Sequence, residues 1–334
     1  MITKKFLLDA LKYIFFFGVG IALFIWAYQG QDIGGILDGL GRFNYWWIAA
    51  SFMPMLLSHF FRAIRWRMLI ESIGYKPGLL NTFLSILVMY LANAAFPRLG
   101  EVTRCGILKK YNGVPFTSQL GTVLVERIVD LIFLIVLLTG VLVFNWDELS
   151  TLIRPEKGIS GTRLSFIQSP WFIGLVGIMI IIAVLIYSFR KQLMKFPLAI
   201  KLHSYAAKFG DGLKSVLRLK QPYVFVMLTV AIYACYYLST LFVYKAFIPT
   251  ASLSPMVALA VLATGSLGMV LPSPAGIGTF DVFAINTVIL YGVTLADGQL
   301  VTLVLHGSTT LFIIIVGAIA LGILPIVNKK KKYT

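Results

Sequence analysis

The sequence has few residues of the kinds that hold metals, disulfides or cofactors. Its 334 residues include only 2 cysteines and 3 histidines. Cys105 and Cys235 lie in unrelated apolar segments, and His59, His203 and His306 are equally scattered. This spacing suits neither a disulfide framework nor a thiolate metal site, and no glycine-rich phosphate loop follows a strand pattern. The sequence therefore predicts no metal site and no cofactor.

Charge is also scarce, because 13% of the residues are charged whereas 59% are hydrophobic. The apolar residues form long blocks and do not show the spacing of an amphipathic helix. A bilayer core of about 30 Å takes roughly 20 apolar residues as a helix, and several blocks approach or exceed that length. The pattern predicts an all-α, polytopic integral membrane protein and excludes a soluble enzyme.

Acidic residues are fewer than basic ones, with 13 Asp and Glu against 29 Lys and Arg and a formal net charge of +16. In a soluble chain this excess would suggest nucleic-acid binding. Here the basic residues cluster in short segments between apolar blocks, as membrane orientation and contact with anionic lipid require. We therefore expect membrane lipids as partners and no nucleic acid.

The apolar blocks and basic loops together predict about six full spans and two re-entrant hairpins. The blocks run at residues 13–28, 45–61, 79–96, 117–144, 171–189, 223–247, 255–271, 277–293 and 300–327. Basic residues flank block 79–96 on both sides, so both of its ends should face the cytoplasm and the chain should turn back within the membrane. Blocks 255–271 and 277–293 should form the second re-entrant element, which enters from outside. The same rule places both termini on the cytoplasmic side of the cell inner (cytoplasmic) membrane.

The predicted elements occur in one order twice, with opposite membrane orientation. The order of span, span, re-entrant element and span suggests one transmembrane domain over residues 1–334, built as the inverted repeat found in many transporters. Its halves would be 1–146 and 170–328, with a basic cytoplasmic loop at 190–222. In such folds the broken segments of the two halves meet near the midplane and line a site. Here these segments are 93–104 and 271–281.

Charged residues inside apolar blocks cost about 2.5 to 3.5 kcal/mol each on insertion, so each needs a partner or a function. Arg62 and Arg65 stand three apart, on one helical face, and suit either a lipid phosphate or a positive-inside anchor. Glu126, Arg127 and Asp130 form a charged patch in block 117–144. They suit either a structural network with the arginines or direct contact with a ligand.

The segment 93–104 supplies a second group of candidates. Pro97 and Gly100 should break the helix and leave backbone donors free. Its candidate headgroup-binding residues are Asn93, Arg98, Glu101 and Arg104. The arginines suit charge-assisted, bidentate contacts with phosphate, and the carboxylate suits orienting an arginine or accepting from a headgroup. The alternative is an Arg/Glu brace that only stabilises the hairpin.

The last candidate segment contains two prolines and two glycines, Pro272, Pro274, Gly276 and Gly278. These residues require an unwound turn and aim the N-terminus of the following helix, with its partial positive charge, at the predicted site. Asp281 stands in the first turn of that helix. It suits either a headgroup contact or a helix cap.

The four motifs, in this order and spacing, resemble the transmembrane region of the lysylphosphatidylglycerol synthase family, a family of flippase-like membrane proteins. They are Arg-Ala-Ile-Arg-Trp at 62–66, the segment 93–104, Glu-Arg-Ile-Val-Asp at 126–130 and Pro-Ser-Pro-Ala-Gly-Ile-Gly at 272–278. In that family the last motif usually ends in glutamate, where this sequence has Asp281. The soluble aminoacyl-transfer domain of the namesake synthases is not in this sequence. The resemblance thus implies lipid translocation or lipid handling and argues against lysyl transfer.

We therefore expect a flippase-like lipid transporter that binds an anionic headgroup, of a phospholipid or of a polyprenyl-phosphate-linked lipid, and moves it across the cytoplasmic membrane. The protein is not expected to be an enzyme. Two alternatives remain: a membrane-embedded transferase that acts on a lipid-linked donor, and an accessory scaffold for enzymes of cell-envelope lipid or glycan synthesis.

Overall fold

The structure is a computed structural model that describes residues 17–30, 33–144, 219–271 and 273–329. Within these ranges the regular elements are helices, apart from one isolated bridge between Phe43 and Phe247. The predicted all-α, polytopic membrane fold is confirmed. The apolar block 171–189, most of the predicted loop 190–222 and Pro272 lie outside the described residues.

Four helices are long and apolar enough to cross a membrane: α3 (Tyr45–Ser72), α6 (Phe116–Phe144), α12 (Pro222–Lys245) and α16 (Leu295–Val327). Each coincides with a predicted apolar block. The first block contains a shorter helix, described over Phe17–Ala27, which we name the N-terminal helix. The count of six full spans stays a prediction.

Side-chain caps show why two of these helices begin where they do. Asn44 precedes α3, and its side chain accepts a hydrogen bond from the backbone N–H of Trp46. Thr294 precedes α16 and accepts from the N–H of Asp297 in the same way. Such caps satisfy donors that the first helical turn leaves free.

The block around residue 79 forms a helical hairpin, as predicted. Its arms are α4 (Leu79–Ala95) and α5 (Leu99–Asn112), and the chain breaks at 96–98, where Arg98 has a positive φ of 65°. The Gly100 N–H donates to Asn93 Oδ1 at 2.7 Å. A Cβ on Gly100 would overlap the Met89 carbonyl and the Asn93 side chain. This close approach of the two arms explains the glycine.

A second hairpin has the arms α14 (Pro255–Val270) and α15 (Thr279–Leu290), joined through the short 3₁₀ helix η1 (Pro274–Gly276). Backbone φ is positive at Ala275 (51°), Gly276 (82°) and Gly278 (76°). A Cβ on Gly278 would overlap the backbone of Gly20 in the N-terminal helix. The break therefore serves both as a turn and as a close contact with the start of the chain.

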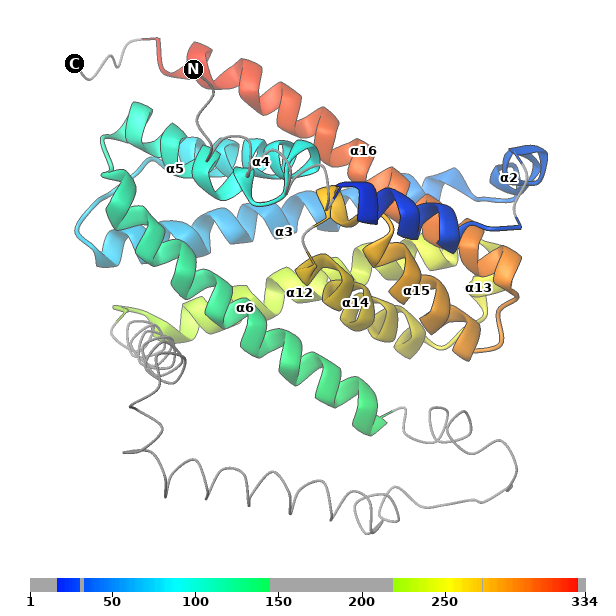
Figure 1. The fold of residues 1–334 in the computed structure, drawn as a ribbon. Helices are drawn as coiled ribbons and strands as arrows, with labels where there is room; N and C mark the ends of the chain where they lie inside the picture. The colour runs from blue at the N-terminus through cyan, green and yellow to red at the C-terminus, as the bar shows by residue number, and fades with distance from the viewer. Residues whose placement is uncertain (1–16, 31–32, 145–218, 272, 330–334) are drawn as a thin grey trace, which may run out of the picture.

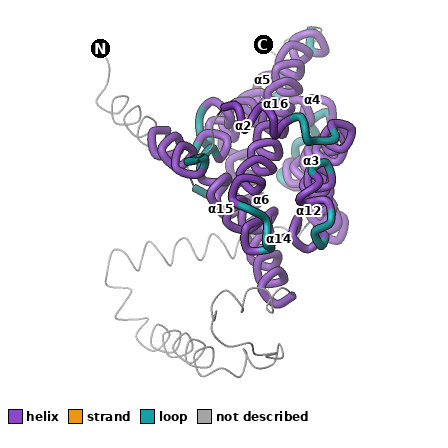
Figure 2. The backbone as a smooth tube through the Cα atoms, turned by 90° about the vertical axis from the view of Figure 1, so that its right-hand side faces the viewer, coloured by secondary structure: helices purple, strands orange, loops and turns teal. Residues whose placement is uncertain are grey.

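The two hairpins lie beside a central pair of long helices (Figures 1 and 2). α3 packs along α12, while α16 packs on α4 and on α15. η1 of the second hairpin contacts α4 of the first. The break of the second hairpin thus packs against an arm of the first hairpin, and the inverted repeat stays a prediction. The short helices α2 (Ile33–Leu40) and α13 (Ile248–Ala251) complete the described chain.

Polar contacts at each end of the bundle show which helix ends lie on the same side. Asn81 at the start of α4 donates to Asn112 at the end of α5 at 3.0 Å and to Asn328 after α16 at 2.9 Å. At the other end, Arg42 before α3 pairs with Asp297 in α16 at 3.1 Å. The base of the first hairpin and the end of α16 therefore lie on one side, opposite the start of α3.

Candidate functional site: a buried arginine cluster

The charged residues of α3 and α6 meet inside the helical bundle. Arg62 Nη1 lies 2.6 Å from Glu126 Oε1 and 2.9 Å from Asp130 Oδ2. Arg65 Nη2 lies 2.6 Å from Asp130 Oδ1 and 3.4 Å from Glu126 Oε1. Residues three apart on α3 thus face residues four apart on α6, so each pair shares one helical face.

Arg104 of α5 completes the group from the first hairpin. Its Nη1 lies 2.9 Å from Glu126 Oε2, and its guanidinium lies 4.3 Å from the centre of the Trp66 ring. The Arg104 side chain is fully buried, and whereas Nη1 contacts Glu126, Nε and Nη2 have no hydrogen-bond partner among the described residues. The Arg104 charge is therefore balanced by Glu126 and by the aromatic face of Trp66, and the donors on Nε and Nη2 are unused.

Two further residues border this group on its exposed side. Arg127 Nη2 lies 3.7 Å from Glu101 Oε1 and 3.8 Å from Glu126 Oε1, and the Arg127 side chain is 44% exposed. We name the whole set the arginine cluster. It consists of Arg62, Arg65, Glu101, Arg104, Glu126, Arg127 and Asp130. Its four guanidinium groups face three carboxylates, so one formal positive charge is in excess.

Hydroxyl groups of α12 extend the arginine cluster, although the sequence pattern did not predict them. Arg65 Nη1 donates to Thr229 at 3.0 Å, and Arg62 Nη2 donates to the Tyr236 hydroxyl at 3.4 Å. The Tyr233 hydroxyl donates to the Asp130 carbonyl at 3.1 Å. Threonines and tyrosines are common in apolar helices, so no sequence signal separates these three from the rest.

His59, one turn before Arg62 on α3, is a further residue that the sequence analysis did not select. Its ring is buried against Tyr90 with the ring centres 4.3 Å apart, and neither ring nitrogen has a hydrogen-bond partner. The Tyr90 hydroxyl in turn lies 3.1 Å from the Tyr236 hydroxyl. The α3 side of the arginine cluster therefore also carries polar groups that are not fully satisfied.

Other candidates from the segment 93–104 lie outside the arginine cluster. Arg98 is exposed at the tip of the first hairpin and has no ion-pair partner among the described residues. Asn93 holds the N-terminus of α5 through its bond to the Gly100 N–H, and Pro97 stands in the break. These residues shape the hairpin, whereas Arg104 and Glu101 reach the charged group.

Asp281 belongs to a separate polar group in the second half. Its Oδ2 accepts from the Gly278 N–H at 2.8 Å, so it caps α15. Its Oδ1 accepts from the Tyr28 hydroxyl at 3.0 Å and lies 3.0 Å from His306 Nδ1. Within the described ranges, no group of three or more His, Cys, Asp or Glu side chains is placed to hold a metal ion.

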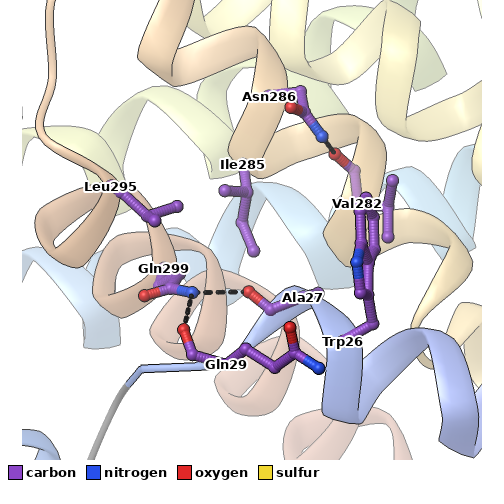
Figure 3. A pocket seen from close by; sticks show the side chains of 8 residues that line it. All are labelled: Trp26, Ala27, Gln29, Val282, Ile285, Asn286, Leu295 and Gln299. Carbon is purple, nitrogen blue, oxygen red and sulfur yellow. Dashed lines mark hydrogen bonds between the residues drawn. The ribbon is translucent and has the colours of Figure 1, made fainter.

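A small cavity of about 240 Å³ is lined in part by sequence neighbours of Tyr28 and Asp281 (Figure 3). The N-terminal helix and the turn after it, α15 and α16 contribute its lining, which consists of Trp26, Ala27, Gln29, Val282, Ile285, Asn286, Leu295 and Gln299. The Gln299 amide donates to the carbonyls of Ala27 at 2.6 Å and Gln29 at 3.2 Å. This bond ties α16 to the C-terminal end of the N-terminal helix.

Long apolar helices, two broken hairpins and a charged cluster at their centre define a polytopic membrane protein with a buried polar site. The model of the lysylphosphatidylglycerol synthase transmembrane region matches residues 12–317. The chain belongs to this family, which confirms the resemblance found in the four motifs.

Two curated relatives are similar over part of the chain. One is a UPF0104 membrane protein of Methanocaldococcus jannaschii, 30% identical over 132 residues that cover 39% of this chain and 37% of that protein. The other is the glycosyltransferase AglD of Haloferax volcanii, 28% identical over 138 residues that cover 39% of this chain and 22% of that protein. The chain thus spans less than two fifths of each relative. No solved structure matches it.

Proposed function

We propose that this protein is a flippase-like transporter that binds an anionic lipid headgroup in the arginine cluster and moves it across the cytoplasmic membrane. The single observation that carries the proposal is Arg104. Its guanidinium is fully buried, its Nε and Nη2 lack hydrogen-bond partners, and the cluster around it has a positive charge in excess.

A purely structural brace would be expected to satisfy its own donors, because a buried unpaired donor costs about 1 to 3 kcal/mol. The arginine cluster leaves donors unused on Arg62, Arg65 and Arg104. A phosphate group offers several acceptor oxygens, and guanidinium groups bind it through two parallel bonds. A phosphate-bearing headgroup therefore fits the unused donors and the excess charge.

The arrangement of α6 suggests how a lipid would reach the cluster. Only 17% of the most apolar window of α6 is buried, so much of this helix is available to lipid tails. Arg127 on α6 and Glu101 on α5 stand at the exposed side of the cluster, while Arg104 lies behind them. The headgroup would enter between α5 and α6, which must separate, and its acyl or prenyl tails would stay in the bilayer.

The comparisons support a role in lipid or glycan processes of the cell envelope. The family is named for the membrane region of a lipid-modifying synthase, and the relative AglD is named a glycosyltransferase. The partners we propose are anionic phospholipids or polyprenyl phosphates, with cell-envelope synthesis enzymes as further candidates. No nucleotide-binding motif occurs in the sequence, so the driving force would come from a gradient or from a partner.

Translocation in proteoliposomes tests the proposal. Vesicles would contain fluorescent phosphatidylglycerol or a labelled polyprenyl phosphate, and the labelled lipid that changes leaflet would be measured. We expect Arg104→Gln to lower the initial rate at least tenfold, because the buried charge for the phosphate is lost. Arg42→Gln is the matched control, since Arg42 pairs with Asp297 at the opposite end of the bundle, and it should keep the wild-type rate. Equal rates for wild type and Arg104→Gln would contradict the proposed site.

A transferase that acts on a lipid-linked donor is the second candidate, and the name of the relative AglD favours it. Mass spectrometry of lipids from overexpressing cells distinguishes the two functions. A new glycosylated or aminoacylated lipid that disappears in Arg104→Gln would support the transferase. An unchanged set of lipids with active translocation would support the transporter.

A further inference from the structure

His306 lies between two hydrogen-bond acceptors in the second half of the protein. Its Nε2 is 2.9 Å from the carbonyl oxygen of Ala275, and its Nδ1 is 3.0 and 3.1 Å from the two carboxylate oxygens of Asp281. A carbonyl oxygen can only accept, so Nε2 must carry a proton. The Asp281 contact needs a proton between nitrogen and oxygen as well. The pair therefore holds one proton more than a neutral histidine beside an ionised aspartate.

The neighbours of Asp281 indicate where this extra proton resides. The carboxylate also accepts from the Tyr28 hydroxyl at 3.0 Å and from the Gly278 N–H at 2.8 Å. An ionised carboxylate is an acceptor at both oxygens, which suits these donors. The geometry thus describes a protonated imidazolium ring of His306 paired with an Asp281 carboxylate.

No other positive charge compensates Asp281 in the elements packed around it. The described part of the N-terminal helix and the turn after it contain one titratable residue, Tyr28. Helix α15 contains only Asp281 itself, and α14 and η1 contain no titratable residue. α16 adds Asp297 far along the helix, and α4, which contacts η1, adds Tyr90. Loss of the His306 proton would therefore leave a carboxylate that is 1% exposed without a counter-ion, an unfavourable state.

The same proton is tied to the break in the second hairpin. Ala275 has a φ of 51°, a strained conformation that L-residues with a side chain seldom adopt. His306 holds the Ala275 carbonyl, and Asp281 holds the Gly278 N–H, so the pair secures both ends of the break. A neutral His306 ring has one N–H and can donate to either Asp281 or the Ala275 carbonyl, but not to both. One of these two hydrogen bonds at the break would then be lost.

The cavity of Figure 3 is lined by sequence neighbours of Tyr28 and Asp281, and not by Tyr28, Asp281 or His306 themselves. Tyr28 lies between the cavity-lining residues Ala27 and Gln29 in sequence, and Asp281 directly precedes the lining residue Val282 (Figure 3). His306 is 11 residues into α16, roughly 16 Å along the axis, which is about half of the bilayer core. The pair thus lies deeper along α16 than the cavity, to which α16 contributes Leu295 and Gln299.

We propose that Tyr28, Asp281 and His306 form the binding site of a coupling proton, whose presence closes the break of the second hairpin and whose release drives lipid movement. This inference rests on the proposed transport function. The proton binds as a neutral ring nitrogen of His306 becomes an N–H, and it leaves to water in the cavity beside Val282. The site is separate from the arginine cluster, which would hold the lipid.

The protonation state of His306 is the first test, and it does not depend on transport. Nitrogen NMR of the full chain in lipid nanodiscs, labelled at its 3 histidines, distinguishes rings with one and two protons. The resonance that disappears in His306→Gln identifies the residue. We expect two ring protons at pH 7 in wild type and one in Asp281→Asn. A single ring proton at pH 7 in wild type would overturn the proposal, whatever the variants do.

Coupling is the second test, with labelled polyprenyl phosphate or phosphatidylglycerol in proteoliposomes. An imposed gradient of one pH unit should change the wild-type initial rate at least threefold, and His306→Gln should lose this response. Ser308→Ala is the control, because among the described residues the Ser308 hydroxyl bonds to the carbonyl of Leu305 on its own helix, and it should keep the response. Transport that ignores the gradient would overturn the coupling and leave the proposed function intact. No transport under any condition would overturn the proposed function, and the coupling with it.

Discussion

Arg62 donates to Glu126 at 2.6 Å in a position where the Glu126 side chain is fully buried. Glu126 also lies within ion-pair distance of Arg65 and Arg104. One carboxylate therefore joins helices α3, α5 and α6. Its negative charge is the main reason that several guanidinium groups can share the interior of an apolar bundle.

Glu126→Gln should destabilise the protein strongly, because it leaves buried guanidinium groups without their shared counter-ion. Breaking a buried ion pair costs about 3 to 5 kcal/mol. Thermal unfolding in detergent, followed by tryptophan fluorescence or by loss of the monodisperse peak, measures the effect. Glu71→Gln is the control: Glu71 pairs with Arg67 at 2.8 Å, both side chains are more than one third exposed, and the change should cost less than about 1 kcal/mol. Equal losses in the two variants would contradict the central role of Glu126.

Gly100→Ala should weaken the first hairpin, because the new methyl group would overlap the Met89 carbonyl and the Asn93 side chain. Overpacking of this kind costs about 1 to 3 kcal/mol. Gly106→Ala on the same helix meets no atom within 4 Å and should be neutral or slightly stabilising. Unfolding midpoints of the two variants, measured side by side, check the difference. A midpoint for Gly100→Ala equal to that of Gly106→Ala would show that α4 and α5 are further apart than described.

Gly278→Ala should separate the N-terminal helix from the second hairpin. Its φ of 76° is unfavourable for alanine, and a Cβ would overlap the Gly20 carbonyl and approach the backbone N of Phe24. Gly292→Ala isolates the backbone contribution, since Gly292 has a φ of 83° but no atom within 4 Å. We expect Gly292→Ala to cost about 1 kcal/mol and Gly278→Ala to cost more by the added overlap. Limited proteolysis near the N-terminus should increase only in Gly278→Ala.

Membrane orientation can be tested with single cysteines in a background without the two native ones. Lys110 and Lys329 are exposed at the end that carries the base of the first hairpin, whereas Asp38 and Leu295 are exposed at the other end. By the positive-inside rule, a thiol reagent that does not cross membranes should label positions 38 and 295 in intact cells. Positions 110 and 329 should react only after permeabilisation. The reverse labelling would place both hairpins and both termini on the wrong sides.

The sequence predicted much of the arginine cluster because its members follow helical spacing. Arg62 and Arg65 share a helical face, as do Glu126 and Asp130. Charges on one face of a long apolar helix are expected to point together into the bundle, away from lipid. The choice between Arg98 and Arg104 could not be made in this way. It depends on where α5 begins, which is decided by the contact between Gly100 and Asn93 across the hairpin.

The second polar group was less accessible to sequence reasoning. Asp281 was selected, and its capping role was one of two open interpretations, but its partners were not identified. His306 lies 25 residues after Asp281 in the chain, and Tyr28 lies 253 residues before Asp281. One histidine within an apolar helix carries no pattern, so only tertiary packing brings these three residues together.

The joint between α3 and α12 has a mechanical consequence. At one end the Asn44 N–H donates to the Ala246 carbonyl at 2.8 Å, and the rings of Phe43 and Phe247 stack with centres 4.4 Å apart. Arg62 and Arg65 lie toward the far end of α3, about 18 residues or roughly 27 Å from this joint. If the two helices rock about this joint, the guanidinium groups are displaced much further than the residues near the joint, so a rotation there would act on the arginine cluster.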